Sequence, residues 1–300
     1  CMRSKILELQ KKLQQRTMIF MDGGMGSEIQ IRGVKTALPL WSADALLTDP
    51  HVVQEIHEDN IRAGADILIT NTFRTTKRAF EKKNISEQAR DAAILACQLA
   101  KQAIKKVNPD RSIYIAGSIA PLEECYSPEL TPPQSEVETE HIEIVQDLKD
   151  GGADFILFET MITLREIISG LQAATKVGIP AAVSFCVNDK FQLLSGESLD
   201  EVMEEVEKYQ PIFVGVNCIS LPIATKTVPY LKKLTELPIS VYAQGDGETD
   251  KDEGWKIKDK NNKQHYIAAA KQWATDGATI IGGCCGTSPD YISSLRKSLE

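Results

Sequence analysis

The chain has 300 residues, of which 42% are hydrophobic and 25% are charged, an ordinary globular composition that excludes extensive disorder. This length fits one large domain, here taken as residues 1–300, and supplies enough apolar material for a substantial core. The formal net charge is -8 and the lysines are interleaved with acidic residues, so no nucleic-acid partner is expected.

The opening segment, residues 1–16, is predicted to form an amphipathic helix, with Ile6, Leu7, Leu9 and Leu13 as its apolar positions among Lys and Gln. It lacks the apolar centre of a signal peptide, and no later apolar run has the length of a membrane span. Seven cysteines, an odd number without an export signal, are typical of a reducing compartment. We therefore expect a cytoplasmic protein with no membrane partner, while its oligomeric state stays open.

A short β-rich run followed by a longer segment of helical period recurs eight times along the chain. The predicted strands are Thr17–Met21, Asp66–Thr70, Ser112–Ala116, Asp154–Phe158, Ala181–Phe185, Ile212–Val216, Ile239–Ala243 and Thr279–Ile281. The predicted helices include Pro50–Ala63, Ser86–Lys106, Ser135–Asp150, Leu164–Val177, Leu199–Lys208, Ala224–Thr235 and His265–Thr275. The pattern predicts an α/β fold, a single-domain (β/α)8 TIM barrel, although counting units does not by itself exclude an open doubly wound sheet.

Two further patterns refine this topology. Three of the strand entries repeat a short motif, at Ala63–Asp66, Gly151–Asp154 and Asp276–Thr279. Two long irregular stretches, Pro121–Pro133 and Gln244–Lys263, follow the third and seventh predicted strands. Both stretches therefore fall at the C-terminal ends of barrel strands, where barrel enzymes place their active sites, and are expected to form lids or substrate walls.

Three cysteines stand at predicted strand ends. Cys218 ends the sixth strand, and the adjacent pair Cys284 and Cys285 ends the eighth within a glycine-rich stretch. Neighbouring residues of an extended strand point to opposite faces, so both can bind one metal only if the backbone turns between them, as Gly282, Gly283 and Gly286 would permit. Three thiolates without a fourth protein ligand are the pattern of a catalytic zinc with one open position. The alternative is that all three are small buried hydrophobes.

The remaining cysteines and the histidines serve as a comparison. Cys97 and Cys186 have neither a glycine setting nor a partner and are predicted to be buried core residues, while Cys125 is left undecided. All four histidines, His51, His57, His141 and His265, fall in predicted helices. A histidine-bound metal hydrolase is therefore not expected.

These stretches together resemble the homocysteine S-methyltransferase family. The matching segments are Met21–Gly26, Pro39–Ala43, Ala116–Ser118, Phe158–Thr160, Gly215–Cys218 and Gly282–Gly286, which spread over nearly the whole chain. The split cysteine pattern is the most specific of them. The resemblance implies a barrel enzyme, a Zn²⁺ held by the three cysteines, homocysteine as methyl acceptor and methionine as product.

The resemblance also assigns roles to residues near the strand ends. It implies that Asp22 and Glu159 bind the amino group of homocysteine and that Gly23 and Gly24 lie near its carboxylate. A buried ammonium group needs carboxylate partners, and a carboxylate can be bound by the backbone N–H groups of a glycine turn, so the chemistry agrees. There are two further candidates. Asn217 is an orienting residue or simply makes strand-end hydrogen bonds, and Trp41 is a wall of the donor pocket or part of the core.

The methyl donor is less defined, because the segments Pro121–Pro128 and Gly245–Asp250 match no donor-specific pattern. We expect a free onium compound, S-methylmethionine or S-adenosylmethionine, since the sequence lacks folate- and cobalamin-binding domains and the extended C-terminal region of betaine-dependent relatives. The alternatives are betaine as donor, another thiol or selenol as acceptor, and a non-catalytic zinc-binding protein. Small-molecule substrates are the only partners that the sequence implies.

Overall fold

Eight parallel strands form the centre of the protein, for which a computed structural model describes residues 2–245, 247–250, 254–256 and 262–300. The strand order is β1, β10, β7, β6, β5, β4, β3, β2. Met21 forms a parallel bridge to Ile67 and so joins the two outer strands. The strands are β1 (Ile19–Phe20), β2 (Ile67–Ile69), β3 (Tyr114–Ile119), β4 (Phe155–Met161), β5 (Ala181–Phe185), β6 (Val214–Asn217), β7 (Ile239–Tyr242) and β10 (Ala278–Ile281). The sheet is thus a closed barrel, as the sequence predicted, and not an open doubly wound sheet.

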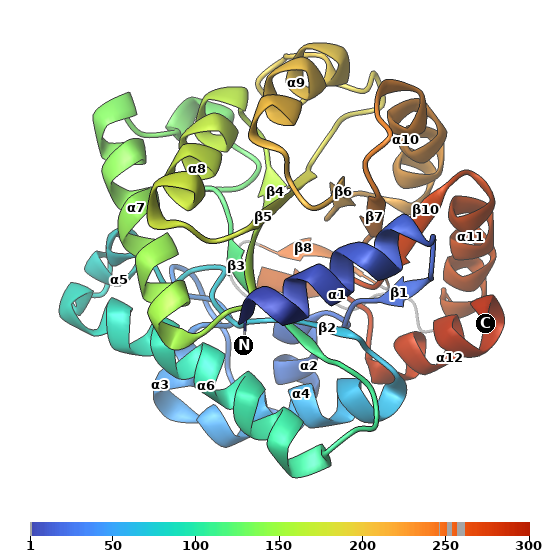
Figure 1. Cartoon of the computed structure of the whole chain (residues 1–300). Coiled ribbons are helices and arrows are strands. Elements are labelled where there is room, and N and C mark those ends of the chain that lie inside the picture. Colours follow the sequence, from blue (N-terminus) through green and yellow to red (C-terminus); the bar gives the residue numbers. More distant parts are fainter. Residues whose placement is uncertain (1, 246, 251–253, 257–261) are drawn as a thin grey trace.

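The helices surround this barrel (Figure 1). The long ones are α4 (Pro50–Ala63), α6 (Ala89–Val107), α7 (Gln134–Gly151), α8 (Leu164–Val177), α9 (Leu199–Val206), α10 (Leu221–Leu234), α11 (Lys263–Thr275) and α12 (Pro289–Leu299). Sequence patterns did not predict α12 or the short helices α2 (Met25–Ile31), α3 (Asp44–Thr48) and α5 (Lys77–Glu81). A helix of one or two turns shows too few residues for a periodic pattern, so its hydrophobic spacing carries little signal.

The repeated motif at three strand entries is a helix ending followed by a strand start. Gly64, Gly152 and Gly277 all have positive φ, at 112°, 88° and 108°, the left-handed conformation that ends a helix. In the first two copies the following aspartate then accepts a backbone N–H of a neighbouring strand, with Asp66 bound to Phe20 and Asp154 to Ile115. The motif therefore sets the point at which the chain enters the barrel.

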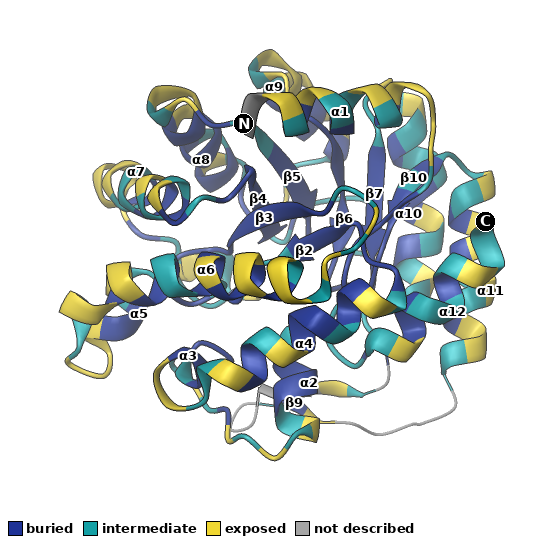
Figure 2. Cartoon of the chain, turned by 60° about the horizontal axis from the view of Figure 1, so that its bottom comes forward, coloured by how far each residue is buried: buried dark blue, intermediate teal, exposed yellow. Residues whose placement is uncertain are grey.

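Helix α1 (Met2–Gln14) covers one end of the barrel, as Figures 1 and 2 show. Its buried residues Ile6, Leu9 and Leu13 pack on an apolar cluster inside the strands that includes Tyr114 and Phe155. The helix predicted for residues 1–16 is thus observed over Met2–Gln14, while Leu7, one of its predicted apolar positions, is exposed. Cys1 lies outside the described residues. This end of the barrel is thereby closed, which leaves the opposite end for a site.

The opposite end carries the connections that follow the strands, and Figure 2 shows β9 on the far side of the barrel from α1. The stretch predicted as irregular after β7 contains a small antiparallel hairpin of β8 (Glu248–Asp250) and β9 (Gly254–Lys256), so that prediction was wrong there. Residues 246, 251–253 and 257–261 of the same stretch lie outside the described residues. None of the helices in the described ranges has the length and apolar character needed to cross a membrane.

Candidate active site

A cavity of about 610 Å³ opens at this end of the barrel. Its lining combines residues that lie in or follow β1, β2, β3, β4, β6, β7 and β10. The aromatic members are Trp41, Phe73, Tyr126, Tyr242 and Trp255, and the cysteines are Cys125, Cys218, Cys284 and Cys285. A largely apolar cavity with a few convergent polar groups at this position is the usual form of a barrel active site.

The three predicted metal ligands meet in this cavity. Cys218 follows β6, and Cys284 and Cys285 follow β10. Cys218 has a φ of 53°, a left-handed conformation that residues other than glycine seldom adopt. Backbone strain of this kind persists only where the surrounding structure enforces it, and here it belongs to a residue whose thiol faces the other two.

The three thiols are close enough to shift one another's pKa values. Contact with Cys284 raises the pKa of Cys218, and contact with Cys218 raises that of Cys285, with burial adding to both. The pKa of Cys284 is also raised, where contact with Cys218 opposes the effects of Cys285 and burial. Three thiols that would repel one another as anions are a donor set for a cation. In the side-chain arrangement of this structure, no group of three His, Cys, Asp or Glu side chains among the described residues is placed to hold a metal ion.

The glycines around the cysteine pair act differently from the prediction. Only Gly286 has positive φ, at 79°, whereas Gly282 and Gly283 allow close packing. A Cβ on Gly282 would lie 2.5 Å from the Cβ of Met21, and one on Gly283 would lie 2.2 Å from Oγ1 of Thr287. The turn after the pair thus needs one flexible residue, and the approach to it needs two small ones.

Hydrogen bonds join the turn after β1 to the cysteine turn. The Thr287 hydroxyl accepts from the Gly24 amide (3.0 Å) and donates to the Cys284 carbonyl (2.7 Å). The Ser27 hydroxyl accepts from the Gly286 amide (3.0 Å) and donates to the Gly24 carbonyl (3.2 Å). These hydroxyls fix the position of the cysteine pair, and no sequence pattern identified them.

Gly24 is the tightest point of this junction, and we expect Gly24→Ala to disturb the cysteine turn. A Cβ at this position would lie 2.5 Å from the Cys284 carbonyl oxygen, so one of two backbone segments has to move. Forced overpacking of this kind costs about 1–3 kcal/mol, and thermal unfolding measures that loss. Gly23→Ala is the matched control, because its new Cβ would meet its nearest atoms only at 3.3 Å. Equal stability losses in both variants would contradict this account.

Glu159 lies near the C-terminal end of β4 and lines the same cavity as the thiols. Its carboxylate accepts a hydrogen bond from the Ser118 hydroxyl and a longer one of 3.4 Å from the Asn217 amide. Burial raises its pKa to about 7, although Ser118 and Tyr242 act in the opposite direction. The group is therefore poised between its neutral and charged forms near neutral pH, and a cation beside it would favour the charged form.

Asn217 holds the backbone that follows Glu159. Its side-chain oxygen accepts from the Thr160 amide (2.8 Å), and its amide nitrogen donates to the Thr160 hydroxyl (2.8 Å). Thr160 has a φ of 56°, so this pair of hydrogen bonds supports a left-handed residue next to the carboxylate. Asn217 is fully buried behind the lining rather than within it, which fits an orienting residue.

Asp22 is buried beside the same space. One carboxylate oxygen accepts from the Ile69 amide (2.9 Å), and the other has no partner among the described residues. Burial raises its pKa well above the ordinary value, and the charge of Glu159 raises it further. His57 lies 4.0 Å away, but burial lowers the pKa of His57 to about 4, so it stays neutral. Within the described part of the chain, the two carboxyl groups thus share a site with no charged cation paired to Asp22.

The glycine turn is less free than expected. The Gly23 amide donates to the Asn60 side chain (3.0 Å), and the Gly24 amide donates to Thr287 (3.0 Å). Both N–H groups are already bound within the protein, although both residues line the cavity. The physical argument that these amides bind a substrate carboxylate is therefore not supported. What still supports a role for Gly23 and Gly24 is that both residues line the cavity.

Trp41 lines the cavity, with its ring packed against Gly26 and in edge contact with Phe73. The ring centroids of Trp41 and Phe73 are 6.1 Å apart. The indole nitrogen is buried and has no hydrogen-bond partner in the described part of the chain. An electron-rich ring at this position can contact a cationic methyl group.

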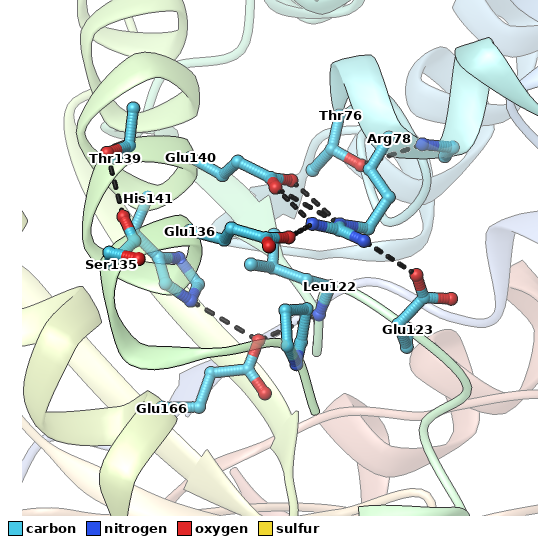
Figure 3. Close-up of polar contacts among 12 residues, drawn as sticks. Thr76, Arg78, Leu122, Glu123, Ser135, Glu136, Thr139, Glu140, His141 and Glu166 are labelled. Atoms are coloured by element: carbon cyan, nitrogen blue, oxygen red, sulfur yellow. Dashed lines mark hydrogen bonds and ion pairs between the residues drawn. The ribbon is translucent and has the colours of Figure 1, made fainter. Parts of the chain in front are cut away.

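Ion pairs hold the stretch Pro121–Pro133 against the barrel (Figure 3). Arg78 of α5 binds Glu123 of the stretch (3.2 Å) as well as Glu136 and Glu140 of α7. Deeper in, a fully buried Glu166 accepts from the Leu122 amide (2.8 Å) and lies 3.3 Å from His141. The expected substrate wall is thus anchored at its first residues, and its next residues, Glu124 to Ser127, line the cavity.

The cysteines and histidines that were predicted not to form a metal site lie where the sequence predicted them. Cys97 and Cys186 are buried, and Cys97 lies within α6 away from the cavity. The undecided Cys125 is buried and lines the cavity. The four histidines all lie in helices, namely α4, α7 and α11.

The fold and this site define a (β/α)8-barrel enzyme whose cavity combines a cluster of three thiols with two buried carboxyl groups. The homocysteine S-methyltransferase family profile matches residues 19–299, so the chain belongs to the homocysteine S-methyltransferase family. It is a methyltransferase of the kind that methylates homocysteine.

Relatives agree with this assignment over nearly their whole lengths. Homocysteine S-methyltransferase of Escherichia coli is 29% identical, with 96% of this chain and 97% of that protein covered. Selenocysteine methyltransferase of Astragalus bisulcatus is also 29% identical, with 93% and 91% covered. The crystal structure of the Escherichia coli homocysteine methyltransferase MmuM in its metallated form superposes with a TM-score of 0.85 at 27% identity, over 96% of this chain and 99% of that one.

Proposed function

We propose that this enzyme transfers a methyl group from a small onium donor to the thiol of homocysteine with the help of Zn²⁺ bound by Cys218, Cys284 and Cys285. The observation that supports it most directly is the meeting of three thiols from two strands in one cavity. The metallated form of the Escherichia coli relative adds to this support. The thiols contact one another, which is the proximity that ligands of one Zn²⁺ require.

The metal, when bound, supplies a Lewis acid that removes the proton of a coordinated thiol, so no separate general base is needed. The chain itself has to orient the acceptor. Asp22 and Glu159 hold the ammonium group of homocysteine, which relieves the repulsion between two buried carboxylates. Asn217 and Ser118 keep the Glu159 carboxylate in place through their hydrogen bonds. The apolar walls around the reacting groups exclude water.

The donor is proposed to be a sulfonium, S-methylmethionine or S-adenosylmethionine. Zn²⁺ with three thiolates has a charge of about -1, and the acceptor thiolate makes it about -2, which attracts a cationic donor. Trp41 and Phe73 add electron-rich rings to the lining. Transfer would form a C–S bond to the homocysteine sulfur as a C–S bond of the sulfonium breaks, which would turn the donor into a neutral thioether and the acceptor into methionine, also a thioether.

Mass-spectrometric measurement of methionine formed from homocysteine tests this function, with S-methylmethionine, S-adenosylmethionine and betaine supplied in parallel to the zinc-loaded enzyme. We expect turnover with a sulfonium. Turnover with betaine alone would show that the donor class is wrong. Zinc binding without methyl transfer from any donor would leave a non-catalytic zinc protein as the better description.

A second acceptor deserves a direct comparison, because the Astragalus bisulcatus relative is a selenocysteine methyltransferase at the same identity as the Escherichia coli enzyme. Selenocysteine carries the same ammonium and carboxylate groups with a side chain one carbon shorter. Competition between the two acceptors at equal concentration gives the ratio of their kcat/KM values. A ratio in favour of selenocysteine would make it the preferred substrate.

A further inference from the structure

Arg74 is a buried cation in the wall of the cavity. It follows β2, it is 9% exposed, and of the described residues that line the cavity it is the one with a positive charge. Its guanidinium group lies 5.9 Å from the centre of the Phe73 ring. A charged side chain is almost never buried in this way without strong partners.

The partners that Arg74 has are weak. One terminal nitrogen donates to the Glu123 carbonyl oxygen at 3.3 Å, and the other lies 3.3 Å from the Glu124 carboxylate. Good hydrogen bonds between a guanidinium and a carboxylate measure about 2.7–2.9 Å. The Nε atom is buried without any partner in the described part of the chain. Arg74 therefore retains donor capacity that a planar anion in the cavity can use.

Arg74 and Glu124 line the same cavity as the three thiols, and Glu124 is next to Cys125 in the chain. Neither residue belongs to the pair that is proposed to hold homocysteine, Asp22 and Glu159, of which Glu159 also lines this cavity. Arg74 and Glu124 are therefore a second pair of charged side chains beside the thiols.

We propose that Arg74 and Glu124 together bind the α-amino-acid end of the methyl donor, with Arg74 on its carboxylate and Glu124 on its ammonium group. This inference rests on the proposed function and narrows its donor to an amino-acid sulfonium. A zwitterion is complementary to an arginine and a glutamate side by side, since each of its charges replaces a long contact between them by a shorter one. Its sulfonium end then extends towards the thiols.

The same pair disfavours donors without both groups. Betaine has a carboxylate for Arg74, but its nitrogen carries no N–H to donate to Glu124. Trimethylsulfonium has neither group. Selectivity among onium compounds would therefore reside in the two residues Arg74 and Glu124, whereas the thiol cluster accepts any of them as a cation.

Calorimetric binding of S-methylmethionine to the zinc-loaded full-length protein, without homocysteine, tests this inference independently of turnover. Loss of one charged hydrogen-bond partner weakens binding by roughly 10- to 100-fold, which we expect for Arg74→Gln. Glu124→Gln should also weaken it, and Arg74→Lys should restore part of the affinity. Binding of trimethylsulfonium should be the same in all of them.

Arg165→Gln is the matched control. Arg165 donates to the carbonyl oxygens of Thr131 and Pro132 in the same stretch but does not line the cavity, so its variant reports any general loosening of that stretch. Unchanged S-methylmethionine affinity in Arg74→Gln, or a loss confined to homocysteine affinity, would overturn the inference. Because donor binding is measured directly, that result differs from a failure of the proposed function, in which the wild-type protein forms no methionine from any donor.

Discussion

Replacement of any one of Cys218, Cys284 and Cys285 by alanine should abolish zinc binding and methyl transfer together. Two remaining thiolates leave a zinc site short of the usual three protein ligands of a catalytic zinc. Ligand loss therefore lowers metal affinity, and without metal the acceptor thiol stays largely protonated at neutral pH, since its ordinary pKa is about 8.5. Zinc content by mass spectrometry and methionine formation should fall together in each variant.

Cys97→Ala is the control for this experiment, because Cys97 is buried within α6 away from the cavity. It should keep both zinc and turnover, with a modest loss of stability from the missing sulfur. Stoichiometric zinc in Cys284→Ala would remove that residue from the ligand set. Full activity after zinc removal would reject the metal for this enzyme altogether.

The barrel could be predicted from the sequence because its signal is local. Each βα unit contains a short apolar run and a helical period, and Pro50–Ala63 and Leu164–Val177 were predicted to the residue. The hairpin of β8 and β9 and the short helices carry no such period. Closure of the sheet between Met21 and Ile67 depends on long-range pairing, which the count of units could suggest but not establish.

The sequence predicted site residues that the structure brings into one cavity, but it did not predict the residues that support them. The cysteines stand out because glycines surround them and because they end strands. The left-handed backbone of Cys218 and the hydroxyl of Thr287 between Gly24 and Cys284 have no sequence signal, since they join segments far apart in the chain. Arg74 was missed for the same reason, because only burial distinguishes it from an ordinary surface arginine.

Glu159→Gln should weaken homocysteine binding by roughly 10- to 100-fold while zinc stays bound, because it removes a charged partner of the substrate ammonium in a buried site. Asp22→Asn should act in the same direction, since Asp22 shares that site and one of its oxygens has no partner among the described residues. Calorimetry on the zinc-loaded variants measures both effects. Unchanged affinity in either variant would exclude that residue from the ammonium site.

The pH dependence gives this prediction a second readout. Burial raises the pKa of Glu159 to about 7, so in the wild-type protein the carboxylate that pairs with an ammonium becomes populated only as pH rises through that value. L-methionine is the suitable probe, because it carries the ammonium group without a titrating thiol. The affinity for L-methionine should increase with pH between about 6 and 8 in the wild type, and most of that pH dependence should be lost in Glu159→Gln.

In the ligand-free protein the same raised pKa makes the contribution of Glu159 to the free energy of unfolding largest below its ordinary value of 4.5, and that contribution is lost as pH rises through about 7. Stability of the variant relative to wild type should therefore improve over this interval, and an unchanged difference would mean that Glu159 ionises normally and that the pH effect on binding comes from another group.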